Sequence, residues 1–116
     1  MKYYDAIKKN TDFKKLYKAK KPVVSESVVI YARRGRSKNR LGITASKKLG
    51  SAVLRNFAKR RLRAIFTEYL IENKSDIYCD FIIVARHKVL TKDYQSLKNE
   101  VFLSLKTATG NVYLKK

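Results

Sequence analysis

The sequence predicts a single small α+β domain spanning residues 1–116. Segments with apolar residues at helical spacing alternate with runs rich in β-branched and aromatic residues, in the order α-β-β-α-β-α. The chain has the length of one ordinary domain, and its 45% hydrophobic residues are enough to bury a core. It contains no internal repeat or flexible linker that would divide it.

The first helix is predicted to begin at Asn10 or Thr11, because both residue types cap helix N-termini. Pro22 sets its limit, since the residue before a proline disfavours the helical conformation. The apolar residues that share one face of this helix are Phe13, Leu16 and Tyr17.

Two strands are predicted next, over residues 27–33 and 40–46, with a turn at residues 35–39 between them. In the second strand apolar residues alternate with Gly42 and Thr44, so we expect one buried face. The turn is short enough for the two strands to form an antiparallel hairpin.

A long helix is predicted to open at residues 50–51, with Ser51 as its N-cap. At 100° per residue its core stripe consists of Leu54, Ala58, Leu62, Ile65, Phe66 and Tyr69.

The near-continuous apolar run over residues 79–86 is typical of a central strand covered on both faces. Thr91 is the expected cap of a last helix, whose core face consists of Tyr94, Leu97, Val101 and Leu105. Residues 107–116 are expected to form a loose tail, with docking as a short extension left open for Val112, Tyr113 and Leu114.

The net charge of the chain limits the classes of partner that it can bind. It has 28 Lys and Arg residues against 9 Asp and Glu, a net charge of +19. Such a field attracts RNA, DNA or an anionic membrane. No apolar run reaches the roughly 18 residues of a membrane span, and the N-terminus lacks the apolar segment of a signal peptide. We therefore expect a cytoplasmic protein without a membrane partner.

The sequence offers no protein-borne active site. Cys79 is the only cysteine, and His87 is the only histidine. A disulfide within the chain is therefore excluded, and His87 has no surrounding pattern of a nucleophile and a carboxylate. Asp76 and Asp80 are near in sequence but look loop-like or strand-terminal. We expect Cys79 to pack as a small apolar residue and His87 to lie at the surface or at a strand end.

Cations gather on the long helix and just before it. No Asp or Glu lies between Glu26 and Glu68, yet Lys59 has a like charge four residues away on either side, Arg55 and Arg63. Like charges at this spacing destabilise a helix, which favours an anionic partner over an ordinary solvated face. The residues expected on this side are Asn56, Lys59, Arg60 and Arg63, and Ser46, Lys47 and Lys48 precede the helix as a candidate phosphate site.

Aromatic side chains give two open interpretations. Phe13, Tyr17 and Tyr31 are interleaved with lysines, so they form either ordinary core or a groove that stacks unpaired bases. Phe57 lies off the apolar stripe of the long helix, where it either covers a neighbouring loop or stacks on a nucleotide.

Residues 41–66 resemble the central region of the bacterial ribonuclease P protein component, with the run Ser-Lys-Lys-Leu-Gly-Ser-Ala-Val-Leu-Arg-Asn-Phe-Ala-Lys-Arg-Arg from Ser46 onward. Residues 8–13 with Tyr17 resemble the family's first helix, and residues 82–86 resemble its last strand. The resemblance implies an α/β sandwich-like, ribosomal-protein-like domain whose βαβ crossover has the unusual left hand.

The resemblance also implies a division of labour. The catalytic RNA hydrolyses the phosphodiester with Mg²⁺, and the protein binds that RNA and the 5′ leader of precursor tRNA, which strengthens substrate and metal binding. It implies no catalytic residue, no metal ligand and no small-molecule cofactor in the protein. The catalytic-RNA contacts it implies are Ser46, Lys47, Lys48, Arg55, Asn56, Lys59, Arg60 and Arg63, and the leader contacts are Phe13, Tyr17 and Tyr31.

One position departs from the family pattern. Phe57 stands where an arginine is usual, which implies the loss of a phosphate contact, and Arg61 is expected to compensate in part, although it points to the other flank of the helix. The alternative function is a ribosomal-type structural RNA-binding protein. A protein-only nuclease is disfavoured because it needs clustered carboxylates for metal ions, and the sequence shows no helix-turn-helix spacing for DNA.

Overall fold

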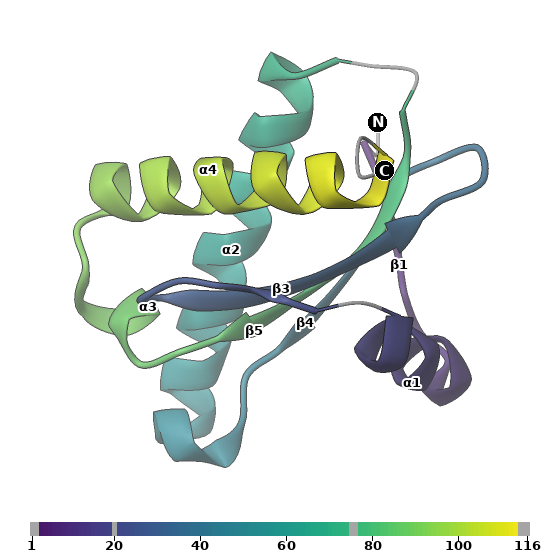
Figure 1. Cartoon of the computed structure of the whole chain (residues 1–116). Coiled ribbons are helices and arrows are strands. Elements are labelled where there is room, and N and C mark those ends of the chain that lie inside the picture. Colours follow the sequence, from purple (N-terminus) through teal and green to yellow (C-terminus); the bar gives the residue numbers. More distant parts are fainter. Residues whose placement is uncertain (1–2, 20, 75–76, 114–116) are drawn as a thin grey trace.

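The computed structural model describes residues 3–19, 21–74 and 77–113, and within them a five-stranded mixed sheet has helices on both faces (Figure 1). The strands are β1 (Asp5–Ala6), β2 (Val23–Val24), β3 (Val28–Arg34), β4 (Arg40–Thr44) and β5 (Cys79–Ala85). The helices are α1 (Asn10–Ala19), α2 (Ala52–Glu72), α3 (Lys88–Thr91) and α4 (Tyr94–Tyr113), with a 3₁₀ turn at Lys47–Leu49. The α+β class predicted from the sequence is confirmed.

Strand β5 holds the sheet together from its centre. The strand order is β1-β4-β5-β3-β2, so Ile83 of β5 pairs with Ile30 of antiparallel β3 and with Ile43 of parallel β4. The predicted hairpin between β3 and β4 is therefore wrong. The most apolar strand takes the central position because there both of its faces and both of its backbone edges are covered.

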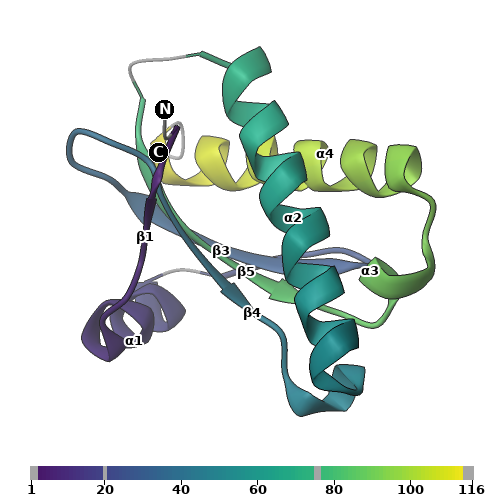
Figure 2. The ribbon, with the colours of Figure 1, turned by 180° about the vertical axis from the view of Figure 1, so that it is seen from behind.

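Helix α2 connects the parallel neighbours β4 and β5, which makes a βαβ unit (Figure 2). The hand of this crossover stays an expectation of the family resemblance.

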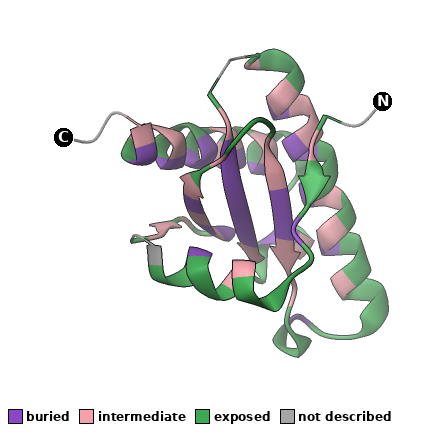
Figure 3. Cartoon of the chain, turned by 90° about the vertical axis from the view of Figure 1, so that its right-hand side faces the viewer, coloured by how far each residue is buried: buried purple, intermediate pink, exposed green. Residues whose placement is uncertain are grey.

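Two apolar layers lie on opposite faces of the sheet. On one face α2 and α4 pack their buried stripes, and Phe66 of α2 meets Phe81 of β5 edge-on with ring centroids 5.5 Å apart. On the other face Leu16 of α1 packs with Ile7 and Ile82 in a smaller cluster. Figure 3 shows the buried centre of the sheet between these layers.

The start of α2 agrees with its predicted cap but differs in one core residue. The Ser51 hydroxyl accepts a hydrogen bond from the Leu54 amide, which confirms the cap. Leu54 itself is exposed rather than in the core, because the first turn of α2 covers Gly50 instead of the sheet. Gly50 has φ +126°, and a Cβ there would lie 2.8 Å from Leu54 Cδ1, so this connection requires glycine.

The C-terminal helix corrects three predictions. It extends to Tyr113 with Val112 buried, so residues 107–113 are helix and not tail, while Leu114 lies outside the described residues. Asp93 caps it by accepting from the Ser96 amide, whereas Thr91 ends α3. Tyr94 is exposed, because its hydroxyl donates to Glu68 on the surface of α2. The remaining predicted core residues, Leu97, Val101 and Leu105, are buried.

Among the described helices, none combines the length and the apolar composition that crossing a membrane requires.

Candidate nucleic-acid interface

The cationic face of α2 comprises Arg55, Asn56, Lys59, Arg60 and Arg63. Asn56, Arg60 and Arg63 are exposed, and Arg55 and Lys59 are half-buried. The buried stripe formed by Ala58, Leu62 and Ile65 fixes the orientation of this face, because it presses the helix onto the sheet and turns the cations outward.

The carboxylates that the structure describes are committed elsewhere. Asp12 and Asp80 form ion pairs with Arg33 and Arg40. Glu26 and Glu100 form ion pairs with Lys92. None of these cations belongs to the cationic face of α2. Of the remaining described carboxylates, Asp5 pairs with Lys38, and Glu68 and Glu72 pair with Lys98. Asp93 caps α4.

Within the described ranges, then, no ion pair neutralises the cationic face of α2. The buried Nε of Arg55 also lacks a hydrogen-bond partner. A row of cations without counter-charges attracts phosphates, and arginine adds two-pronged hydrogen bonds to them.

The 3₁₀ turn before α2 adds exposed polar groups next to this face. Ser46, Lys47 and Lys48 are exposed, and the buried Leu49 anchors the turn in the core. The backbone is fixed by the Leu49 amide, which donates to the Ser46 carbonyl at 3.0 Å. Two exposed ammonium groups thus stand beside the start of the helix, where its dipole also favours an anion.

The aromatic cluster (Phe13, Tyr17 and Tyr31) joins α1 to the sheet. The ring of Tyr17 packs edge-on against Tyr31 with centroids 4.8 Å apart, and the Tyr17 hydroxyl lies 3.3 Å from Thr44 Oγ1. Phe13 and Tyr31 are half-buried, while Tyr17 is 39% exposed. The cluster therefore contributes packing and leaves part of Tyr17 exposed, and the stacking of unpaired bases on these rings stays a prediction.

Gly42 in β4 explains how Phe13 reaches the sheet. A Cβ at Gly42 would lie 2.6 Å from Phe13 Cζ, so the ring occupies the space that any side chain would fill. This close approach also buries Gly42, and β4 is consequently covered on both faces rather than on one.

A hollow of about 180 Å³ connects the two predicted binding regions. Phe13, Gly42 and Ile43 line one side of it, and Lys59 and Arg63 of α2 line the other. The sequence assigned the aromatic residues and the cations to separate surfaces. The fold makes these surfaces continuous, because β4 lies at the edge of the long strands between α1 and α2.

Sequence reasoning missed the arginine–aspartate cluster (Asp12, Arg33, Arg40 and Asp80). Asp80 is 4% exposed in β5, and its carboxylate accepts from Arg40 Nη2 at 2.8 Å and from Arg33 Nε at 3.0 Å. Burial by itself raises the pKa of the Asp80 carboxyl, but the hydrogen bonds from Arg40 and Arg33 outweigh burial and hold that pKa below its ordinary value. Asp80 is thus a paired strand residue, and its partners are too distant in sequence for spacing to reveal them.

Arg61 has a structural role, which contradicts the expectation that it compensates for Phe57. Its Nη1 donates to the carbonyls of Val89 and Lys92 at 2.9 and 2.8 Å and so ties α2 to α3. Its guanidinium also lies over the ring of Phe57, 5.3 Å from the centroid. Arg61 is thereby held away from the cationic face.

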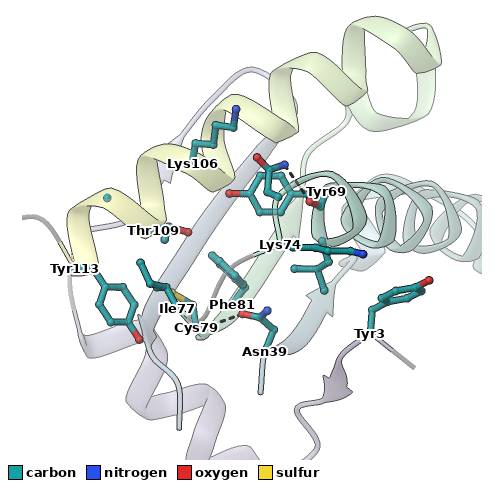
Figure 4. Close-up of a pocket in the computed structure, with 13 residues that line it drawn as sticks. Tyr3, Asn39, Tyr69, Lys74, Ile77, Cys79, Phe81, Lys106, Thr109 and Tyr113 are labelled. Carbon is teal, nitrogen blue, oxygen red and sulfur yellow. Dashed lines mark hydrogen bonds between the residues drawn. The ribbon is translucent and has the colours of Figure 1, made fainter. Parts of the chain in front are cut away.

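A larger hollow of about 490 Å³ lies between the C-terminal ends of α2 and α4 (Figure 4). Tyr69, Phe81 and Tyr113 contribute to its walls, and the sequence-predicted RNA contacts are not among its lining residues. Cys79 lies at this hollow but is almost fully buried, and burial raises the pKa of its thiol to about 11. The thiol therefore stays protonated and packs as a small apolar group. His87 is exposed beside the first turn of α3.

Comparisons with known proteins point to one family. A family model described as Ribonuclease P matches residues 1–109. The "Ribonuclease P protein component" of Streptococcus equi subsp. equi is 36% identical over 109 residues, which cover 93% of this chain and 89% of that protein. The protein of the same name from Macrococcus caseolyticus is 49% identical over 84 residues, 69% of each chain.

Solved structures agree. The Staphylococcus aureus RNase P protein is similar with a TM-score of 0.77 and 34% identity, covering 93% of this chain and 96% of that one. The RNase P protein from Thermotoga maritima gives a TM-score of 0.76 and 26% identity, covering 89% and 96%.

Proposed function

The chain belongs to the bacterial ribonuclease P protein family, and we propose that it binds the enzyme's catalytic RNA through α2 and the 5′ leader of precursor tRNA through α1, with Lys59 and Arg63 of α2 at the border of the two contacts. Membership makes it the protein subunit of a nuclease that acts in tRNA processing and a partner of the ribonuclease P RNA.

The cationic face of α2 is the observation that carries the proposal. Its cations lack carboxylate partners within the described ranges although the same fold pairs Arg33, Arg40, Lys92 and Lys98. Leaving them unpaired costs stability through mutual repulsion, and phosphates of the catalytic RNA would remove that cost. Ser46, Lys47 and Lys48 extend the contact past the start of the helix.

The leader site rests on the hollow between α1 and α2. Phe13 lines it from α1, and Lys59 and Arg63 line it from α2. An unpaired strand has the matching chemistry, with bases for the rings and phosphates for the cations. Tyr17 and Tyr31 continue the aromatic surface along α1 and β3.

We assign Mg²⁺ to the RNA and not to this chain. The described carboxylates already bind cations or cap a helix, and no group of three His, Cys, Asp or Glu residues gathers within the described part of the protein. Mg²⁺ also takes phosphate oxygens as ligands, and the proposal places those on the RNA and its substrate. The protein acts by neutralising phosphates and holding the leader extended. The RNA and its substrate can then keep their bound Mg²⁺ ions when the Mg²⁺ concentration in solution is low.

The decisive experiment is cleavage of a 5′-leader precursor tRNA at low Mg²⁺, with a bacterial ribonuclease P RNA, with this protein, and with both. We expect strong cleavage only when RNA and protein are combined. Cleavage by the protein alone would make it a nuclease in its own right and overturn the assignment of the chemistry to the RNA.

Leader recognition is tested by Phe13→Ala in the same holoenzyme. We expect weaker binding of precursors with long leaders and unchanged binding of mature tRNA. Equal losses on both would show that Phe13 only supports the fold. Leader dependence also separates this function from the ribosomal-type alternative, which the family assignment disfavours and which predicts no response to leader length.

A further inference from the structure

An apolar strip borders the cationic face of α2. Val53 and Phe57 lie one turn apart on this helix and are 75% and 38% exposed. Neither residue takes part in the two apolar clusters of the described chain. Arg60 follows Phe57 by three residues and is its neighbour on the helix surface, so the strip and the cations form one continuous surface.

The ring of Phe57 is held in place from one side. The Arg61 guanidinium lies 5.3 Å from its centroid and 5.7 Å from that of Tyr94, so it sits between two exposed rings. Arg61 cannot swing away without losing its hydrogen bonds to the carbonyls of Val89 and Lys92. A ring fixed before binding loses little conformational entropy when a partner covers it.

The surrounding charge identifies the partner. Any molecule that covers Phe57 also meets Arg60, and the carboxylates of the described chain leave this residue unpaired. An apolar protein surface would bury this charge without compensation, which is costly. A nucleobase has a flat face for the ring and brings its own phosphate for the cation.

We propose that Phe57, with Val53 beside it, is a stacking platform for an unpaired nucleobase of the ribonuclease P RNA. The proposal rests on the proposed binding of that RNA by α2, and it extends the contact from phosphates to a base. Stacking on an aromatic ring contributes about 1–3 kcal/mol per base, which corresponds to a roughly five- to 150-fold loss of affinity when the ring is removed.

The test measures binding of the full chain to the ribonuclease P RNA of the same organism across a series of salt concentrations. We expect Phe57→Ala and Phe57→Leu to weaken binding about tenfold without changing the slope of log affinity against log salt, because a stacked ring displaces no counterions. Phe57→Trp should bind as tightly as the unmodified chain or more tightly. Leu103→Ala, which removes a 68% exposed apolar residue from α4, is the matched control and should have no effect.

Arg60→Ala, measured in parallel, separates the two proposals. If it weakens binding while Phe57→Leu and Phe57→Ala bind normally, the stacking platform is wrong and RNA binding by α2 stands. If none of the three variants weakens binding, both proposals fail. If the Phe57 variants lower the salt slope, the ring does not act by stacking and the platform is overturned. If they dissociate a dimer in sedimentation while RNA affinity stays normal, the ring contacts a second copy of the chain, and the platform is likewise overturned. Phe57→Leu and Phe57→Trp both keep an apolar side chain, so a difference between them reports stacking and not folding.

Discussion

Two arginine-rich regions of this molecule place the same residue types in opposite electrostatic surroundings. In the arginine–aspartate cluster, Arg33 and Arg40 share the carboxylates of Asp12 and Asp80 and tie α1, β3, β4 and β5 together. On the cationic face of α2, Arg60 and its neighbours have no such partners within the described ranges. Local charge density therefore does not identify an RNA-binding surface. The informative property is a row of cations on one helix face for which the described carboxylates supply no counter-charge.

The largest expected effect comes from opening the neutralised region. Asp80→Ala leaves two guanidinium groups without their buried carboxylate and should lower the free energy of unfolding by about 3 kcal/mol, measured by urea denaturation. Asp5→Ala removes only an exposed ion pair with Lys38 and should change the free energy of unfolding by less than about 0.5 kcal/mol. Equal effects of the two substitutions would mean that the cluster is no more structural than an ordinary surface pair.

A second neutralised site predicts a pH dependence of stability. Burial raises the pKa of Glu100, but hydrogen bonds from Lys92, Ser25 and Ser27 outweigh it and lower that pKa to about 2. Because the folded-state pKa lies below the ordinary value of 4.5, this stabilisation is fully present above pH 4.5 and is lost as the pH falls toward 2. The melting temperature should fall in this window.

Glu100→Gln tests the cause of that fall. The variant should be less stable at neutral pH and should lose less of its stability between pH 4.5 and 2 than the unmodified chain does. An identical acid dependence in both proteins would assign it to other carboxylates.

The unpaired region should behave in the reverse way. Arg60→Ala should lower the affinity for ribonuclease P RNA about tenfold at low salt and reduce the log-log salt slope by about 0.7 to 0.9, because one phosphate contact is lost. Its unfolding free energy should stay within about 0.5 kcal/mol of the unmodified value. Lys74→Ala, an exposed cation beyond the end of α2, is the control and should leave RNA affinity unchanged. If the variant lost stability but kept its affinity for RNA, Arg60 would support the fold and would not contact the RNA.

The smallest expected effect lies where the two kinds of surface meet. Gly42→Ala places a Cβ where Phe13 Cζ now lies, which should displace the ring and cost about 1 kcal/mol of folding stability. In the holoenzyme it should weaken binding of leader-bearing precursor severalfold and leave mature tRNA unaffected. Unaltered discrimination between the two substrates would show that leader recognition does not depend on the position of Phe13.

Local sequence patterns were sufficient to predict most helices and strands of this fold, but not which of them lie next to each other in space. The cap at Ser51 and the buried stripe of α2 follow from residues within a few turns of each other, and both are present. The hairpin prediction failed because β3 and β4 are neighbours in sequence, whereas β5, more than 30 residues later, offers a more apolar partner to each. The exposed Tyr94 had helical spacing typical of the core, but its surface contacts with Glu68 and Arg61 come from α2 and are not visible in its own sequence neighbourhood.

The candidate site was predictable to a similar extent. The unpaired cations of α2 follow from the sequence, since no acidic residue lies between Glu26 and Glu68. The continuity between Phe13 and Lys59 required the strand order, and the role of Arg61 required the carbonyls of Val89 and Lys92. These contacts join residues 28 to 46 positions apart, a separation at which sequence periodicity carries no information.

The central place of β5 determines when this protein can acquire its shape during synthesis. Residues 28–34 and 40–44 are translated early but find their common hydrogen-bonding partner only when residues 79–85 emerge. Until then α2, with its unneutralised charges, has no completed sheet to pack against. Folding is consequently a late, long-range event for a chain of this size, and its rate should be governed by closing the loop between the early strands and the last one. A chain cut before residue 79 would carry the cationic helix without the strand that completes the sheet beneath it.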